Sequence, residues 1–111
     1  MTEPLTVERD IVNGGVVASL RVAGEVDLST VAIFDEAISA SVENAHDPLR
    51  IDLSGVTFMD SSGLNALIRA RNTLEERGVK LVISGVSDQV RHLLEISGLA
   101  TAFVIAPELH E

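Results

Sequence analysis

The distribution of hydrophobic residues along the chain predicts five strands and three helices. Dense runs of Val, Ile and Leu are typical of strands, whereas apolar residues about three or four positions apart are typical of helices. Strands are predicted over residues 5–12, 16–22, 50–58, 79–84 and 102–105. Helices are predicted from a cap at Ser29 or Asp27 to about Asn44, from Asp60 to Gly78, and from Ser87 to Gly98. In the strand 50–58 the positions expected to be buried are Ile51, Leu53, Val56 and Phe58.

The order of these elements, β-β-α-β-α-β-α-β, indicates an α/β fold. The turn signal Asn13-Gly14-Gly15 joins the first two strands into a hairpin. Strands separated by single helices form parallel crossovers. The sequence therefore predicts a mixed sheet, parallel except for one antiparallel edge strand, with about three helices packed on it. Residues 23–27 are expected to form a loop and residues 45–48 a connector. No linker or repeat divides the chain, so residues 1–111 are expected to be one domain.

Composition excludes several classes of protein. The chain of 111 residues is 46% hydrophobic, which suits one globular domain and not a disordered chain. The absence of cysteine excludes disulfides and thiolate metal sites. No apolar run approaches the roughly 18 residues that span a bilayer, and the acidic N-terminus does not resemble a signal peptide. These features fit a cytoplasmic protein that does not contact membranes.

The net charge of −9 argues against direct binding of nucleic acid, because clustered Lys and Arg are needed to neutralise phosphates. The charge is unevenly distributed, since residues 1–49 hold two basic and nine acidic side chains. An acidic first half suits a protein partner with a basic face, although solubility alone also accounts for it.

The segment best suited to chemistry is Asp60-Ser61-Ser62-Gly63, where the strand 50–58 passes into a helix. Open α/β sheets commonly place functional groups at such carboxyl ends of strands. One interpretation is helix capping, for which Asp and Ser are among the best residues. The other is that Ser61 is displayed for phosphorylation, since the segment holds more capping groups than one helix needs and Gly63 leaves room for close approach. A phosphate there would face the positive end of the helix dipole and add about −1.5 to −2 charges.

Catalysis by Ser61 is not expected. A serine nucleophile needs a base within hydrogen-bond reach and an oxyanion hole, and no Gly-x-Ser-x-Gly elbow surrounds Ser61. His46 falls in the connector, His92 on the predicted outer side of the third helix, and His110 in the tail. No metal-ligand cluster or phosphate-cradling glycine loop is present. The chain is therefore expected to be a non-enzyme without metal or cofactor.

A second polar segment, Gly24-Glu25-Val26-Asp27, follows the predicted strand 16–22. It either closes this strand and caps the next helix, or it brings Glu25 and Asp27 to the same sheet edge as Ser61, where they share its contact surface. Asp27 is also placed to accept a hydrogen bond from the Ser61 hydroxyl.

Three segments resemble the STAS domain family, named after sulfate transporters and anti-sigma factor antagonists. They are residues 22–27 (VAGEVD), 51–64 (IDLSGVTFMDSSGL) and 93–99 (LLEISGL). The likeness covers nearly the whole chain in the same order, and the match over residues 59–64 is specific. The chain most resembles the bacterial anti-sigma factor antagonists of the SpoIIAA and RsbV kind. The family fold, a mixed sheet with helices packed on it, agrees with the predicted order of elements.

The resemblance implies a binding module switched by phosphorylation. In that family the serine after the Asp, here Ser61, is phosphorylated by a serine-kinase anti-sigma factor that uses ATP. The unphosphorylated form binds this partner and frees a sigma factor, and a serine phosphatase resets the switch. The alternative is a structural STAS subunit of an ABC transporter or of a stress-signalling scaffold. Some relatives end in a further helix, for which only residues 107–111 remain here. The implied contact surface comprises Glu25, Asp27, Asp60, Ser61, Ser62 and Gly63.

Overall fold

A computed structural model describes residues 5–106, and its strands and helices follow in the predicted order. A short 3₁₀ turn, Asn13–Gly15, joins the first two strands. The helices are α1 (Val31–Val42), α2 (Ser61–Glu76) and α3 (Asp88–Ile96). The strands are β1 (Thr6–Val12), β2 (Val16–Val26), β3 (Ala45–Met59), β4 (Leu81–Val86) and β5 (Val104–Ile105).

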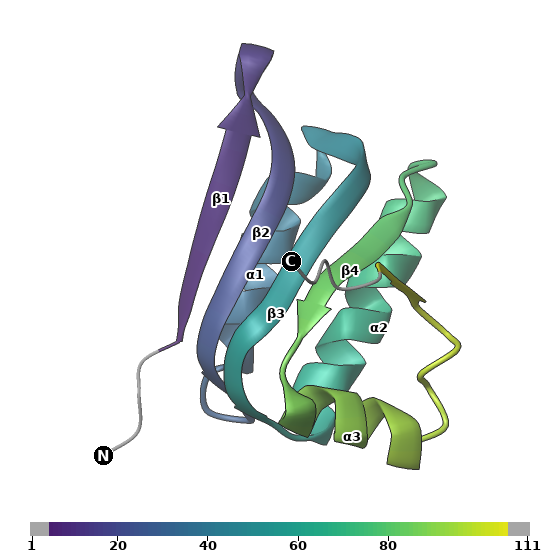
Figure 1. Ribbon diagram of the computed structural model, residues 1–111. Helices are drawn as coiled ribbons and strands as arrows, with labels where there is room; N and C mark the ends of the chain where they lie inside the picture. Colours follow the sequence, from purple (N-terminus) through teal and green to yellow (C-terminus); the bar gives the residue numbers. More distant parts are fainter. Residues whose placement is uncertain (1–4, 107–111) are drawn as a thin grey trace, which may run out of the picture.

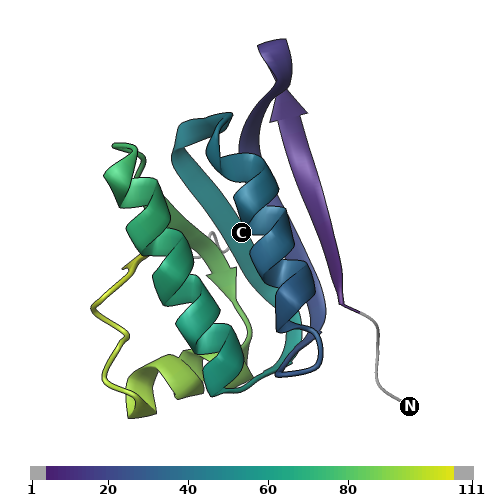
Figure 2. The same cartoon turned by 180° about the vertical axis from the view of Figure 1, so that it is seen from behind.

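The strands form one sheet in the order β1-β2-β3-β4-β5. β1 is antiparallel to β2, and every other neighbouring pair is parallel. α1 and α2 lie side by side on one face of the sheet, behind it in Figure 1 and in front of it in Figure 2. α3 lies at the edge where β3 and β4 end (Figure 1). The predicted mixed α/β sheet with three helices is confirmed.

The core fills the space between the sheet and the helix pair, and it is mainly aliphatic. Each side chain that is fully buried there contributes about 1.5–3 kcal/mol relative to an exposed one. The opposite face of the sheet carries no helix within residues 5–106 (Figure 1). The fully buried core side chains include Leu20, Val22, Phe34, Ile51, Leu53, Leu67, Leu74 and Ile83.

Two β-bulges interrupt the alternation of side chains in the last part of β3. In the pairing with β2, β3 contains one extra residue after Asp52 and a second extra residue after Val56. Each extra residue sends the following side chains to the other face of the sheet. The first bulge brings Val56 to the buried face, and the second leaves Phe58 42% exposed and buries Met59. The prediction that Phe58 faces the core is wrong, because it continued the alternation from the buried Val56 across the second bulge, which lies between Val56 and Phe58.

Several strand boundaries differ from the prediction because pairing with a neighbour extends strands beyond their own apolar patterns. β2 continues to Val26, so most of the predicted loop 23–27 is strand. β3 begins at Ala45, which pairs with β2, so the predicted connector 45–48 is also strand. Pairing with β3 over residues 23–26 and with β2 at Ala45 supplies backbone hydrogen bonds that offset the weak strand preference of Ala, Gly and Glu.

The ends of α1, β4 and β5 also shift by a few residues. α1 begins at Val31, and Thr30 at the assigned N-cap position makes no side-chain cap bond. The predicted capping by Asp27 is present one turn earlier, since its carboxylate accepts the N–H groups of Ser29 and Thr30 and its carbonyl accepts the N–H of Val31. The strand predicted over 79–84 runs from Leu81 to Val86. The strand predicted over 102–105 is confined to Val104 and Ile105. The tail predicted from Pro107 lies outside the described residues. Within residues 5–106, no helix combines the length and the apolar character needed to cross a membrane.

Candidate functional site

The two polar segments singled out in the sequence meet at the carboxyl edge of the sheet. Val26 at the end of β2 pairs with Met59 at the end of β3. The N–H of Asp60 donates a hydrogen bond to the carbonyl of Val26 at 3.3 Å. This bond fixes the start of α2 beside the turn that follows β2. The parallel pairing of β2 and β3 therefore brings Asp27 and Ser61 to the same edge of the molecule.

Asp60 supplies the cap of α2. Its backbone is extended, and its carboxylate accepts a hydrogen bond from the N–H of Ser62 at 2.9 Å. The N–H of Leu64 bonds to the carbonyl of Asp60 at 3.1 Å, which closes the first turn. An Asp at this position typically stabilises a helix by about 1 kcal/mol. Capping thus falls to Asp60 alone, and the two serines are not needed for it.

Ser61 occupies the first helical position with its side chain exposed. No hydrogen bond of its hydroxyl to any other described residue is present, whereas Ser62 beside it is half-buried. The hydroxyl of Ser61 therefore points into solvent at the positive end of the α2 dipole. An incoming enzyme or partner can reach this exposed residue without breaking a hydrogen bond of its hydroxyl within residues 5–106.

Gly63 is buried, and the space beside it is filled from within the protein. A Cβ atom at this position would lie 2.6 Å from Cγ of Met59 and 2.8 Å from Cγ1 of Val26. The missing side chain lets the first turn of α2 pack directly on the ends of β2 and β3. The room that Gly63 leaves is thus occupied by strand side chains.

The turn between β2 and α1 is organised by the carboxylate of Asp27. Oδ1 of Asp27 accepts hydrogen bonds from the Ser29 hydroxyl at 2.7 Å, the Ser29 N–H at 2.9 Å and the Thr30 N–H at 3.2 Å. The bond from the Ser29 hydroxyl, with those from the Ser29 N–H and from Thr30, lowers the pKa of Asp27 against an opposing effect of desolvation. The expected hydrogen bond from Ser61 to Asp27 is not present in the described part of the chain.

Glu25 lies near the same edge but faces away from Ser61. Side chains alternate between the two faces of a strand, and Val26 faces α2. The half-buried side chain of Glu25 therefore points to the helix-free face of the sheet. Phe58, the register partner of Glu25, shares this helix-free face and is 42% exposed, whereas Leu28 is 79% exposed in the turn beside the site.

One residue at this edge was missed by sequence reasoning. Gln89, in the first turn of α3, accepts a hydrogen bond from the N–H of Met59 at 2.8 Å and donates one to the carbonyl of Met59 at 2.9 Å. No motif in the sequence marks Gln89, because it lies 30 residues away from Met59 along the chain.

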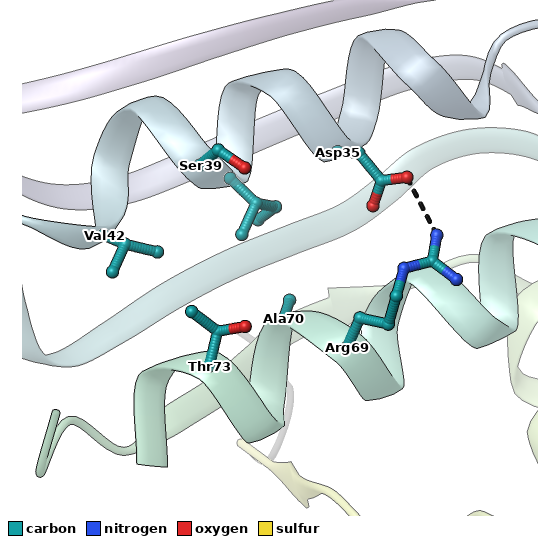
Figure 3. A pocket seen from close by; sticks show the side chains of 7 residues that line it. Asp35, Ser39, Val42, Arg69, Ala70 and Thr73 are labelled. Carbon is teal, nitrogen blue, oxygen red and sulfur yellow. Dashed lines mark hydrogen bonds and ion pairs between the residues drawn. The ribbon is translucent and has the colours of Figure 1, made fainter. Parts of the chain in front are cut away.

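The groove between α1 and α2 is a separate feature, with a volume of about 210 Å³ (Figure 3). An ion pair of 2.8 Å between Asp35 and Arg69 spans it. Ser39 and Thr73 contribute hydroxyls to its walls, but none of the predicted site residues lines it. His46 lies at the amino end of β3, at the other end of the strand from Ser61. Within residues 5–106, no group of three or more His, Asp or Glu side chains could hold a metal ion.

Comparison with known proteins agrees with the fold. The family model of the STAS domain matches residues 9–111, and the chain belongs to this family. The chain is similar to the anti-sigma-B factor antagonist of Listeria monocytogenes, with 40% identity over 79 residues that cover 71% of this chain and 69% of that protein.

Two solved structures show the same architecture. The crystal structure of an anti-sigma factor antagonist from Mycobacterium paratuberculosis has a TM-score of 0.81 and 28% identity, covering 98% of this chain and 92% of that chain. The unphosphorylated form of the anti-sigma factor antagonist SpoIIAA has a TM-score of 0.73 and 25% identity, covering 93% of this chain and 90% of that chain. The predicted resemblance to the STAS family and to its anti-sigma factor antagonists is confirmed.

Proposed function

We propose that this protein is an anti-sigma factor antagonist that is switched by phosphorylation of Ser61. In its unphosphorylated form it binds a serine-kinase anti-sigma factor and thereby releases a sigma factor. The names of the similar proteins from Listeria and Mycobacterium support the antagonist role. The observation that supports the phosphorylation switch is the exposed side chain of Ser61, which is not needed to cap α2 because Asp60 does so.

The fold tolerates a phosphate on Ser61. The positive end of the α2 dipole attracts an anion, because the first N–H groups of a helix are not all bonded within it. The carboxylate of Asp60, one residue away, opposes this attraction. The two effects act in opposite directions at an exposed site, so phosphorylation is expected to leave the backbone of α2 in place. What changes is the surface, which gains about −1.5 to −2 charges.

Such a charge is sufficient to release a partner. The proposed contact surface is centred on Ser61 and includes the exposed side chain of Leu28 in the neighbouring turn. A partner that covers Leu28 and the start of α2 also removes water from residue 61, and desolvating a phosphate there costs several kcal/mol. About 5.5 kcal/mol shifts a two-state equilibrium from 1:99 to 99:1. Binding is therefore controlled without any change of fold.

The remaining predicted site residues take different parts in this proposal. Asp60 and Ser62 border the hydroxyl, and Asp27 holds the neighbouring turn in shape. Gly63 acts through the packing of α2 and not through contact with a partner. Glu25 lies on the helix-free face, where it extends the acidic surface toward a basic partner. A serine phosphatase is the proposed partner that removes the phosphate.

A pull-down with the Ser61→Ala variant tests this function. The variant cannot be phosphorylated, so it is expected to retain its partner in the presence of ATP, whereas Ser61→Asp is expected to bind more weakly. The captured kinase is then incubated with the wild-type chain and ATP, and the phosphate is located by mass spectrometry. Ser62→Ala is the matched control and should still be phosphorylated on Ser61. Phosphate on Ser62 alone, or capture of a transporter ATPase in place of a kinase, contradicts the proposal.

A further inference from the structure

The side chain of Gln89 holds the backbone immediately before Ser61. Its Oε1 accepts the N–H of Met59 at 2.8 Å, and its Nε2 donates to the carbonyl of Met59 at 2.9 Å. An amide side chain offers one acceptor and donors in the same plane, like a peptide group. Gln89 therefore bonds to Met59 as a residue of a neighbouring strand would.

The end of β3 needs hydrogen-bond partners from a side chain because β3 extends beyond the end of β4. The pairing of β3 with β4 ends at Leu53 and Val86, whereas its pairing with β2 continues to Met59. Beyond Leu53 that side of β3 faces α3, which contributes no backbone ladder. Polar backbone groups that are buried without a hydrogen-bond partner destabilise the fold. The amide of Gln89 satisfies both groups of Met59 at the last position of the strand.

The backbone is thus held from both sides just before the helix. Both polar groups of Met59 point toward α3 and bond to Gln89, and the N–H of the next residue, Asp60, points the other way and bonds to Val26 of β2. The Ser61 hydroxyl makes no hydrogen bond of its own within the described residues, so its position depends on this backbone.

We propose that Gln89 is a positioning residue for Ser61, which keeps the hydroxyl in one place for the kinase. This inference rests on the proposed phosphorylation of Ser61. It assigns to α3 a part in the switch, although α3 contributes no residue to the predicted contact surface. Gln89 is not a catalytic residue, because it acts only through the backbone of Met59.

Amide hydrogen exchange of the full chain, measured by NMR, tests the hold on the backbone. Gln89→Leu removes both hydrogen bonds at similar volume, and Gln89→Glu keeps the acceptor but loses the donor. Gln89→Leu is expected to accelerate exchange at Met59 and Asp60 by about tenfold to a hundredfold, with a smaller effect for Gln89→Glu. The matched control is Ile83→Val, in the centre of the buried β4, which should accelerate exchange throughout the sheet.

Two outcomes of the exchange experiment overturn the inference. One is wild-type exchange at Met59 in Gln89→Leu. The other is a uniform acceleration like that of the Ile83→Val control, which would show that Gln89 contributes to overall stability and has no local role. Because Gln89→Glu retains the size and one bond of the native residue, it still gives a result if Gln89→Leu does not fold.

Phosphorylation kinetics test the consequence for Ser61. With the kinase captured by the Ser61→Ala variant, Gln89→Leu is expected to lower kcat for Ser61 by about tenfold to a hundredfold, since a misplaced reacting group is costly. KM for the chain should change little, because the contact surface is intact, and Ile83→Val should leave kcat unchanged. An unchanged kcat in Gln89→Leu overturns the role of Gln89 alone. Absence of phosphate on Ser61 in the wild-type chain overturns the proposed function instead.

Discussion

Replacing Gly63 with Ala tests how closely α2 must approach the sheet. The added Cβ would lie 2.6 Å from Cγ of Met59 and 2.8 Å from Cγ1 of Val26, and both distances are shorter than van der Waals contact. Met59 can change rotamer, but it is buried at 1% exposure and has little free volume. Val26 is β-branched and held in a strand, so it cannot turn away easily. The first turn of α2 must therefore move outward.

The expected cost follows from two opposing effects. Overpacking a core typically costs about 1–3 kcal/mol. Replacing Gly with Ala in a helix contributes up to about 1 kcal/mol in the other direction. We expect Gly63→Ala to lower the free energy of unfolding by about 1–2 kcal/mol, which corresponds to a midpoint of thermal unfolding lower by roughly 5–10 °C.

Urea denaturation at neutral pH measures this change. The matched control is Asn65→Ala, at an exposed position two residues further along α2, which should be neutral or slightly stabilising because it has only the propensity effect. Combining Val26→Ala with Gly63→Ala should cost less than the sum of the two single changes, with a coupling energy of at least about 0.5 kcal/mol. If Gly63→Ala is as stable as the wild-type chain, the argument from close packing is refuted.

Three further predictions concern the cap, the turn and the C-terminal segment. Asp60→Ala should lower the free energy of unfolding by about 1 kcal/mol in urea denaturation, because the N–H of Ser62 loses its acceptor. Because the pKa of Asp27 is lowered in the folded state, its carboxylate stabilises the fold at pH values above the ordinary carboxyl pKa. This contribution is lost as the pH falls through the lowered pKa. Asp27→Asn should therefore weaken the dependence of the unfolding midpoint on pH between about pH 5 and pH 2. Arg71 donates to the carbonyl of Ala102 at 2.8 Å and lies 5.4 Å from the ring centre of Phe103, so Arg71→Leu should accelerate amide exchange in residues 99–106 more than in the centre of the sheet.

The order of elements and the identity of the junction could be predicted because both depend on local patterns. Apolar spacing distinguishes strand from helix within a single segment. The caps at Asp60 and Ser87 are equally local, since each side chain bonds to an N–H two or three residues further on. The prominence of Ser61 followed from the same kind of information, as a hydroxyl next to a strong cap.

The face to which Phe58 and Met59 point could not be predicted. It depends on the bulge between Val56 and Phe58, which arises where β3 fits against β2. The role of Gly63 was likewise hidden, because a glycine in a sequence does not reveal which side chains occupy the space beside it. Asp27 was expected to reach Ser61, but the hydroxyl of Ser29 and the N–H groups of its own turn are closer partners.

Periodicity and capping residues were thus enough to establish an α/β chain with an accessible serine at a helix start, because the interactions involved span only a few residues. The surroundings of that serine were settled by packing. The exposed Phe58, the occupied space at Gly63 and the bonds from Gln89 all depend on contacts between segments that are distant in sequence. Such contacts exist only after the sheet has assembled, because register and bulges are properties of pairs of strands.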